Sequence, residues 1–456
     1  NNDDRSARDR FQPSLESVVE IQVVRNQFSA EYGRASGGRV NLRTRSGSNR
    51  LRGRAFMFFR DDGLNANTWF NNSRGISRLP LRSYNPGFTL SGPVELPFYN
   101  GRNRTFFSIS YEYNRLNDST LIDTFLPVVQ NPNFALPPPT GSEQFCDSTN
   151  AANCPASAGF ISPFSAVIST PNTTHTINTR IDHKLFNGND ITFGHQFGRK
   201  KNRRTRTAST TRIEDALQAR NSDTDAFNIT DNQVFGNKAV NQVRFQWSRF
   251  KPSFQTENPL DSVVLIGYRS PLTNGTQTLI AGNSTASSLQ DFADTRNETR
   301  YQIQESLTVA AGRHTLKIGG DLQDVDSKAT ALGDATGTFN FANVQNFSNN
   351  VLSRFRQNFG TATDVTNTYW GIFVNDEINI RRGLTLTLGL RYERETAVSD
   401  DDNFGPRIGL AWDPVGDGKS VIRMGAGIFY NRVLLRTVGD FIQNGLGGIE
   451  AFDSNS

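Results

Sequence analysis

Alternation of apolar and polar residues with a period of two is the feature that most constrains the fold of this chain. In LTLTLGLRYERE (384–395), four leucines and a tyrosine occupy every second position, and threonine, glycine, arginine and glutamate occupy the positions between them. The same period recurs in 241–250, 314–323 and 420–432. This is the period of a β-strand and not of a helix. Helical patterns are nearly absent, so the sequence predicts an all-β fold.

About thirteen strands are predicted along the 456 residues. They begin near residues 53, 84, 104, 175, 189, 222, 239, 298, 314, 367, 384, 404 and 420. Most reach the ~9–11 residues that a tilted strand needs to cross a membrane, which is longer than the usual strand of a soluble protein.

The connections between these strands are alternately short and long. Short turns are expected at 186–189, 236–238, 311–313, 381–383 and 414–419, and long polar segments at 60–83, 116–174, 199–221, 251–297 and 326–366. Only the connection at 395–403 breaks the long set. This alternation is typical of up-and-down membrane barrels, which have tight turns on one side and long loops on the other. A soluble sandwich has no reason to sort its connections in this way.

The composition agrees with an antiparallel transmembrane β-barrel. Hydrophobic residues make up 36% of the chain and the mean hydropathy is −0.52, yet 34 residues are Phe. Barrel strands combine a polar lumen face with aromatic residues at the membrane interfaces. No apolar run approaches the ~18 residues of a membrane-spanning helix. The net charge of +5 does not by itself indicate nucleic acid as a partner.

Residues 28–49, FSAEYGRASGGRVNLRTRSGSN, carry a family resemblance. Together with the following GRAFMFFR, the segment resembles the plug-to-barrel junction of TonB-dependent outer-membrane transporters, most closely the Oar-like branch. RTFFSISYE (104–112), NFGPRIGLAWDP (403–414) and GDGKSVIRMGAGIFYNR (416–432) are similar to barrel strands of that branch. The resemblance implies that 1–52 is the C-terminal part of a plug domain. It also implies that 53–456 is the N-terminal portion of the barrel, about 13 of ~22 strands.

The resemblance places the junction motif inside the barrel lumen. The motif residues are Glu31, Tyr32, Gly33, Arg34, Gly37, Gly38, Arg39, Arg43 and Arg45. We expect the four arginines to face lumen carboxylates or water, and the glycine pair to let the backbone pass close to the wall. Arg39, Arg43 and Arg45 depart from the usual phrase, so this end of the plug is unusually basic.

Two cysteines, Cys146 and Cys154, lie close together in a segment rich in Ser, Asn and Ala. Their spacing predicts one local disulfide and an oxidising compartment, and two unpaired thiols are the alternative. The four histidines lie elsewhere in the sequence, so no metal site is expected.

A basic run, RKKNRRTR (199–206), has three interpretations. It consists of Arg199, Lys200, Lys201, Arg203, Arg204 and Arg206 with Asn202 and Thr205. It is either a solvated outer loop or a contact to lipopolysaccharide phosphates, because clustered Arg and Lys bind phosphate. The third interpretation is nucleic acid, but the run lacks the interleaved aromatic residues that single-stranded nucleic acid would need.

No catalytic constellation is found, and neither an enzyme activity nor a cofactor is expected. GDGKS (416–420) lacks the first glycine of a P-loop, because residue 413 is Asp. The resemblance implies ligand uptake across the outer membrane, energised by TonB through a segment that we expect to lie outside this chain. The ligand is unknown; oligosaccharides, peptides and other large substrates are candidates. The alternative is a structural or adhesive barrel that binds surfaces through its long outer loops.

Overall fold

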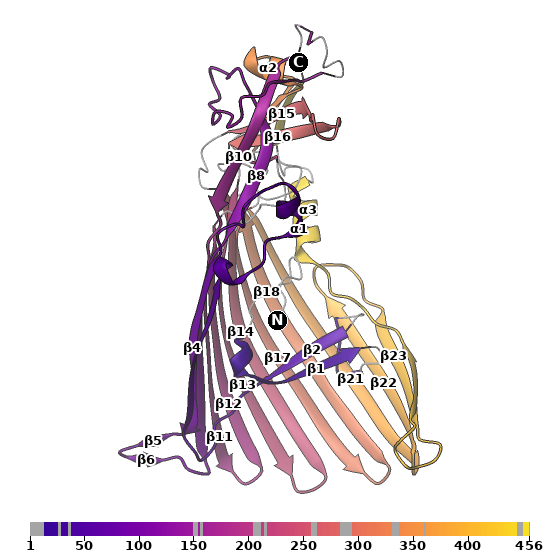
Figure 1. The fold of residues 1–456 in the computed structure, drawn as a ribbon. Coiled ribbons are helices and arrows are strands. Elements are labelled where there is room, and N and C mark those ends of the chain that lie inside the picture. Colours follow the sequence, from indigo (N-terminus) through magenta and orange to yellow (C-terminus); the bar gives the residue numbers. More distant parts are fainter. Residues whose placement is uncertain are drawn as a thin grey trace.

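The computed structural model describes residues 13–25, 29–34, 38–148, 154–155, 158–203, 211–213, 217–256, 262–282, 294–330, 337–359, 362–444 and 450–455. Within these ranges the chain forms a curved antiparallel sheet, a small hairpin on the concave side of that sheet, and a separate layer at one end (Figure 1). In the described part of the chain, no helix is long and apolar enough to cross a membrane.

The curved sheet contains thirteen strands in the described part of the chain, and each pairs with its neighbours in sequence order. The strands are β3 (Arg52–Asp61), β4 (Arg82–Pro93), β7 (Thr105–Asn117), β11 (Asn172–Phe186), β12 (Asn189–Asn202), β13 (Gln218–Phe235), β14 (Ala239–Thr256), β17 (Asp294–Ala311), β18 (His314–Thr330), β21 (Thr363–Arg381), β22 (Leu384–Glu395), β23 (Asn403–Trp412) and β24 (Ile422–Gly427). Each predicted start lies within about four residues of an observed one. The all-β, up-and-down barrel prediction is therefore confirmed.

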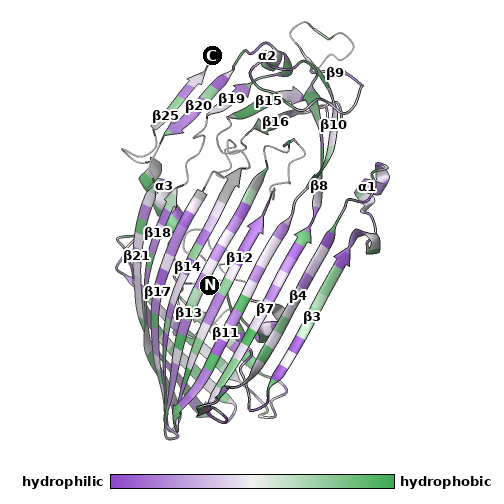
Figure 2. Cartoon of the chain, turned by 90° about the vertical axis from the view of Figure 1, so that its left-hand side faces the viewer, coloured by the Kyte–Doolittle hydropathy of each residue, from purple (hydrophilic) through white to green (hydrophobic). Residues whose placement is uncertain are grey.

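The two faces of the sheet differ as the alternation requires. On β22, Arg391 and Glu393 are buried on the concave, lumen face, whereas Leu388 and Leu390 are exposed on the convex face that meets lipid. Figure 2 shows the resulting alternation of polar and apolar residues along the strands. β13, β14, β17, β18 and β21 have 17 to 19 residues. Because ~9–11 residues suffice to cross the membrane, these strands extend beyond it.

Tight turns join the strands at one end of the barrel. Gly188, Gly236, Gly312 and Gly383 take positive φ angles in four of these turns, a conformation that other residues rarely adopt. The β4–β7 connection at the same end carries a small hairpin, β5 (Glu95–Leu96) with β6 (Tyr99–Asn100). By the rule that short turns face the periplasm, this is the periplasmic end.

A hairpin from the segment that the resemblance predicts to be part of a plug lies inside the curve of the sheet (Figure 1), and we call it the plug hairpin. It is formed by η1 (Leu15–Ser17), β1 (Val18–Arg25) and β2 (Gly38–Thr44), and β1 pairs antiparallel with β2. Residues 29–34 lie between the two strands in the chain. The first barrel strand begins soon after the hairpin ends, at Arg52.

The long connections at the opposite end, which were predicted only as polar segments, fold together into an outer layer. Its elements are β8 (Ser119–Pro127), β9 (Phe145–Cys146), β10 (Phe160–Ser169), β15 (Val263–Arg269), β16 (Thr276–Gly282), β19 (Thr338–Phe341), α2 (Val344–Ser348), β20 (Arg354–Phe359) and β25 (Glu450–Asn455). They enclose a hydrophobic core whose fully buried members include Leu126, Ile161, Ile266, Leu279, Phe341 and Phe347. Because these residues come from three different connections, the connections fold together.

The first and last connections of the described chain carry short helices. η2 (Asp62–Leu64) and α1 (Trp69–Ser73) lie between β3 and β4. The strand predicted over 420–432 is shorter than expected, because β24 ends at Gly427. The chain then forms α3 (Leu435–Asn444) and joins the outer layer through β25, which pairs with β20.

Candidate functional site

The segment Ser29–Arg34 of the plug is bound to the lumen face of β21, β22 and β23. The side chain of Ala30 is fully buried there, and its backbone N–H donates to Asn375 Oδ1 at 3.3 Å. Arg407 on β23 donates from Nη1 to two backbone carbonyls of the segment, Ser29 O at 2.6 Å and Tyr32 O at 2.7 Å. One guanidinium therefore holds the backbone of the segment at two places.

Arg391 on β22 holds the middle of the segment. Its side chain is only 1% exposed. From Nη1 it donates to Ala30 O at 3.2 Å and Glu31 O at 3.3 Å. The same guanidinium pairs with Glu393 and donates to the hydroxyl of Tyr369. Leaving a buried cation without its partners costs much free energy, so loss of any of these partners should weaken the site strongly.

Two further ion pairs join the plug segment to the wall. Arg34 Nε lies 3.2 Å from Glu395 Oε1, with the two side chains 11% and 9% exposed. The Arg34 guanidinium also lies 4.5 Å from the ring centre of Tyr369, which favours a cation–π contact. Glu31 pairs with Lys317 of β18. We call residues 29–34 with their wall partners the plug clasp, and the wall partners are Lys317, Tyr369, Asn375, Arg391, Glu393, Glu395 and Arg407.

Gly33 has a steric reason to be glycine. A Cβ added there would lie 1.9 Å from Glu393 Oε1 and 2.3 Å from Arg391 Nε, so a side chain would displace the wall ion pair. The next residue, Arg34, takes a φ of +59°, which is uncommon for a residue other than glycine. Such backbone strain persists where surrounding contacts hold it, and the Arg34 ion pair supplies them.

The remaining residues of the predicted junction motif have different surroundings. Gly38 is the first residue of β2, and Gly37 and the Arg39 side chain lie outside the described residues. Arg43 pairs at 3.7 Å with Glu20 of the plug's own hairpin, and both side chains are exposed. Arg45 donates from Nε to the carbonyl of Glu16 at 2.9 Å. Of the described arginines of the motif, Arg34 therefore meets a lumen carboxylate, whereas Arg43 and Arg45 bind within the plug.

The wall half of the plug clasp was not identified from the sequence, although part of its signal was visible. The alternation in 384–395 places Arg391 and Glu393 on the polar face. The alternation does not reveal that they meet a segment 361 residues earlier in the chain. The sequence did contain one indication of this site. Charged residues on the lumen face of a strand need partners in a partly dehydrated interior.

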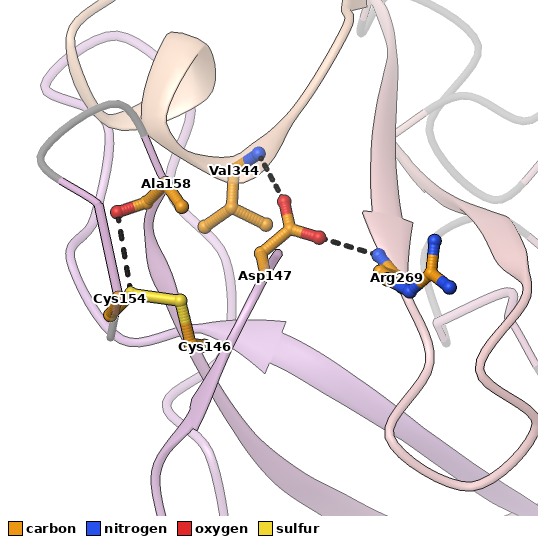
Figure 3. The surroundings of a disulfide bond; sticks show 6 residues. All are labelled: Cys146, Asp147, Cys154, Ala158, Arg269 and Val344. Carbon is orange, nitrogen blue, oxygen red and sulfur yellow. Dashed lines mark hydrogen bonds between the residues drawn. A yellow bond between two sulfur atoms is a disulfide. The ribbon is translucent and has the colours of Figure 1, made fainter. Parts of the chain in front are cut away.

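Cys146 and Cys154 form a disulfide in the outer layer. Next to it, the Asp147 carboxylate accepts hydrogen bonds from the backbone N–H groups of Arg269 and Val344 (Figure 3). Asp147, Arg269 and Val344 belong to three different connections between barrel strands. The disulfide therefore sits beside a carboxylate that joins these connections to one another.

The basic run 199–206 is only partly a loop, contrary to the prediction. Residues 199–202 are the end of β12, which is paired with β11 and β13 on its two sides. Arg199 Nε lies 3.0 Å from Asp223 Oδ1 across the β12–β13 pair. Lys200 and Lys201 alternate between faces, and Arg203 follows the strand. Arg204 and Arg206 lie outside the described residues. The strand continues into the run because both neighbouring strands supply backbone partners.

In the described part of the chain, no group of three or more His, Cys, Asp or Glu side chains is arranged to hold a metal ion. The Asp413 carboxylate is used in the β23–β24 turn, where it accepts from the backbone N–H groups of Gly416 at 2.7 Å and Gly418 at 2.8 Å. The P-loop-like letters GDGKS therefore belong to a tight turn.

Comparison with solved structures finds similar folds among outer-membrane proteins. The outer membrane transporter YddB from Escherichia coli is 11% identical, with a TM-score of 0.62 over 96% of this chain and 51% of that one. The siderophore receptor PirA from Pseudomonas aeruginosa is 13% identical, with a TM-score of 0.54 over 92% and 51%. A mutant of the ferric enterobactin receptor PfeA from Pseudomonas aeruginosa is 14% identical, with a TM-score of 0.54 over 91% and 49%. The chain spans about half the length of these proteins.

No curated protein matches the sequence. The profile of the family described as "Outer membrane beta barrel domain" matches residues 43–160 and 139–403, which together make up more than half of the chain. This match, the thirteen-stranded sheet of the described residues and the similar solved structures agree with one another. The chain therefore belongs to the outer membrane β-barrel domain family, and it is a protein of the outer membrane.

Proposed function

We propose that the chain is part of a TonB-dependent receptor that imports a ligand across the outer membrane, and that it acts as a carrier rather than as an enzyme. The observation that carries this proposal is the plug clasp. A segment preceding the barrel is held in the lumen by side chains of the wall, as a removable obstruction would be.

The contacts of the clasp suit a plug that must be both held and released. They are hydrogen bonds and ion pairs, and each contributes on the order of 1 kcal/mol, or about 1.5–3 kcal/mol where a charged group takes part. Together they hold the segment in place at rest. A pulling force applied through the preceding chain can break them one after another, because they lie along a short stretch of the chain.

The solved structures point in the same direction. One is named a transporter and two are named receptors for siderophores or ferric enterobactin. We propose the same class of activity for this chain, with a large polar ligand such as an oligosaccharide or a peptide. The folded outer layer would provide a broad surface for recognising such a ligand.

We also propose that lipopolysaccharide contacts the convex face of β12, β13 and β14. His195 stacks on Phe227 with ring centres 4.3 Å apart, and Phe227 contacts Trp247 at 5.7 Å. This aromatic group is typical of a membrane interface. Arg199 lies beyond His195 toward the outer end of β12, where lipid phosphates would be met. Arg199→Glu should reduce the lipopolysaccharide that co-purifies with the protein.

Depletion of solutes from culture medium tests the import proposal. Strains with the intact gene, without the gene and without TonB would be grown on a mixture of oligosaccharides and peptides, and the residual solutes would be measured by mass spectrometry. Import predicts that the same solutes remain in the medium of both deletion strains. If the gene deletion spares no solute and changes only surface attachment, the chain is an adhesive barrel and the proposal is wrong.

A further inference from the structure

The hairpin β5–β6, at the periplasmic end of the barrel, presents large apolar side chains to its surroundings. Phe98 in its tip is 86% exposed, and Leu96 on β5 is 50% exposed. A side chain that stays this exposed gains little of the free energy that burial of its apolar surface would give. In Figure 1 the hairpin projects sideways from the end of β4, away from the lumen. The surroundings that could bury these side chains therefore lie outside the barrel wall.

Hydrogen bonds hold this hairpin on the convex face of the sheet. Ser110 of β7 lines a lumen cavity together with Ser17 of the plug hairpin, so Thr105, an odd number of residues away, lies on the opposite, convex face. The hydroxyl of Tyr99 on β6 forms a hydrogen bond with Thr105 Oγ1, which lies 2.7 Å from Nδ1 of His183 on β11. This chain of three side chains places the hairpin on the lipid-facing side of β7 and β11.

The hairpin leaves the barrel near the depth at which the membrane ends. The backbone N–H of Lys184, close to the end of β11, donates to Arg104 O at 2.8 Å, so the base of the hairpin is level with this end of β11. Phe186, the last residue of β11, is 67% exposed, and Phe235 at the end of β13 is 55% exposed. Aromatic side chains of membrane barrels gather at the two membrane interfaces. Phe98 therefore lies near the inner interface of the outer membrane.

Basic side chains lie at the base of the hairpin. Arg104 and Lys184 are both exposed, and Arg104 Nε donates to the carbonyl of Lys184 at 3.3 Å. Arg102 is 62% exposed and pairs with Glu95 of β5, so its charge is partly compensated. A phospholipid leaflet suits an apolar tip with cations behind it, because the tip enters the acyl region while the cations contact phosphates. The charge and the apolar surface of the hairpin are therefore complementary to the periplasmic leaflet.

We propose that the hairpin β5–β6 is a membrane foot, which inserts Phe98 and Leu96 into the phospholipids of the periplasmic leaflet beside the barrel. Arg104 and Lys184 contact the phosphate groups of the same leaflet. The hydrogen-bond chain that begins at Tyr99 positions the foot on the convex face. The inference goes beyond ligand import and does not depend on it, because it needs only the place of the barrel in the outer membrane.

The membrane foot lies beside the point at which the plug segment joins the barrel. Asn103, which follows the hairpin, donates from its backbone N–H to Asn49 Oδ1 at 2.7 Å. Asn49 belongs to the short linker between the plug hairpin and β3. A foot inserted in lipid therefore steadies this part of the barrel rim against the membrane.

Photo-crosslinking in intact cells tests the membrane foot. A photoreactive phenylalanine analogue would replace Phe98 in the full-length protein, and mass spectrometry would identify what it captures. The same analogue at Phe193, on the convex face of β12 and 42% exposed, is the lipid-facing control. At Asn237, in the tight turn between β13 and β14, it is the water-facing control. Heat-dependent gel mobility would confirm that each variant is folded.

Phospholipid should be the main product captured from position 98, as it should be from position 193. The yield of lipid adducts at 98 should exceed that at 237 at least about tenfold, because burial of a side chain of this size favours the inserted state by about that factor or more. The yield at 98 should fall when Thr105→Val is added, because this variant lacks the hydroxyl that holds Tyr99. Thr105→Ser keeps a hydroxyl and should preserve the yield.

Three results would overturn the insertion of the foot. Capture of a periplasmic protein would make the tip a docking site for a soluble partner. Capture of another part of the full-length chain would mean that the protein itself covers the tip. A lipid yield at 98 no higher than at 237 would mean that the tip lies in water. Equal yields in Thr105→Val and Thr105→Ser would overturn the positioning role of the hydrogen-bond chain.

Discussion

Replacing Arg391 by methionine should release the plug segment from the barrel wall. The substitution keeps much of the side-chain volume but removes the guanidinium that binds Ala30 O and Glu31 O. It also leaves the Glu393 carboxylate, 8% exposed, without the cation that it faces. Removing one partner of a buried ion pair costs about 3–5 kcal/mol. At about 1.4 kcal/mol per factor of ten, opening of the segment should become roughly 10²- to 4 × 10³-fold more frequent.

Amide hydrogen exchange of residues 29–34 in the purified full-length protein measures this opening. The Ala30 N–H is bonded to Asn375 Oδ1 and the Tyr32 N–H to Ser29 O at 3.0 Å, so both report on the closed segment. Local opening governs their exchange when the barrel itself stays folded. The strands of the barrel should keep their protection in the variant.

Arg394→Met is the matched control on the same strand. Arg394 pairs with Asp401 at 2.8 Å, but the two side chains are 48% and 65% exposed. Exposed pairs contribute about 0–1 kcal/mol, so exchange of 29–34 should be unchanged. Unaltered protection in Arg391→Met, or an equal loss in both variants, would refute the assignment of Arg391 as the centre of the clasp.

Four further predictions concern the barrel faces, the outer layer and a turn. Leu388→Arg should block assembly into the outer membrane far more than Thr387→Arg, because a lipid-facing cation costs about 2–4 kcal/mol at mid-membrane, and heat-modifiable protein in membranes measures this. Unreduced protein should take up no thiol-alkylating reagent, and two equivalents after reduction, by mass spectrometry. Asp147→Asn should lower the stability of the outer layer by about 1–3 kcal/mol, because the amide NH₂ group would face one of the two backbone N–H donors. Faster proteolysis of the outer layer measures this loss. Backbone N–H groups hold the pKa of Asp413 below its usual range, so the ionised carboxylate stabilises the turn. This stabilisation should be present above pH ~4 and should be lost as the pH falls below that value. The difference in proteolysis rate between the native protein and Asp413→Asn measures it.

The barrel strands were predictable because their signal is local. Period-two alternation needs only neighbouring residues, and the lipid and the lumen impose it on every strand. The prediction was wrong at the end of the last strand of the sheet. The apolar alternation continues to Tyr430, but pairing with β23 stops at Gly427. The basic residues at 199–202 were predicted to begin a loop, but their backbone pairs with β11 and β13 and they form the end of a strand.

The outer layer and the wall half of the plug clasp depend on contacts between distant segments. β15 pairs in parallel with β19, although another barrel hairpin separates them in the chain, and the core between them collects side chains from three connections. Each of these segments is polar on average, and its few buried residues resemble scattered surface residues in the sequence. The EYGR segment was identified from its family resemblance. The wall residues that bind it are set by the register of the barrel strands, which the sequence pattern does not reveal.

Photo-crosslinking from Tyr32 tests the central claim, that a plug segment is held in the lumen against β21–β23. A photoreactive phenylalanine analogue at this position in the full-length protein, irradiated in intact cells without TonB, should capture peptides from the strands that line the same small pocket as Tyr32, such as those containing Gln304, Asp321 or Phe373. Mass spectrometry identifies the captured peptide. Capture of β3, β4, β7, β11 or β12 peptides, of lipid, or of nothing at all would contradict the account.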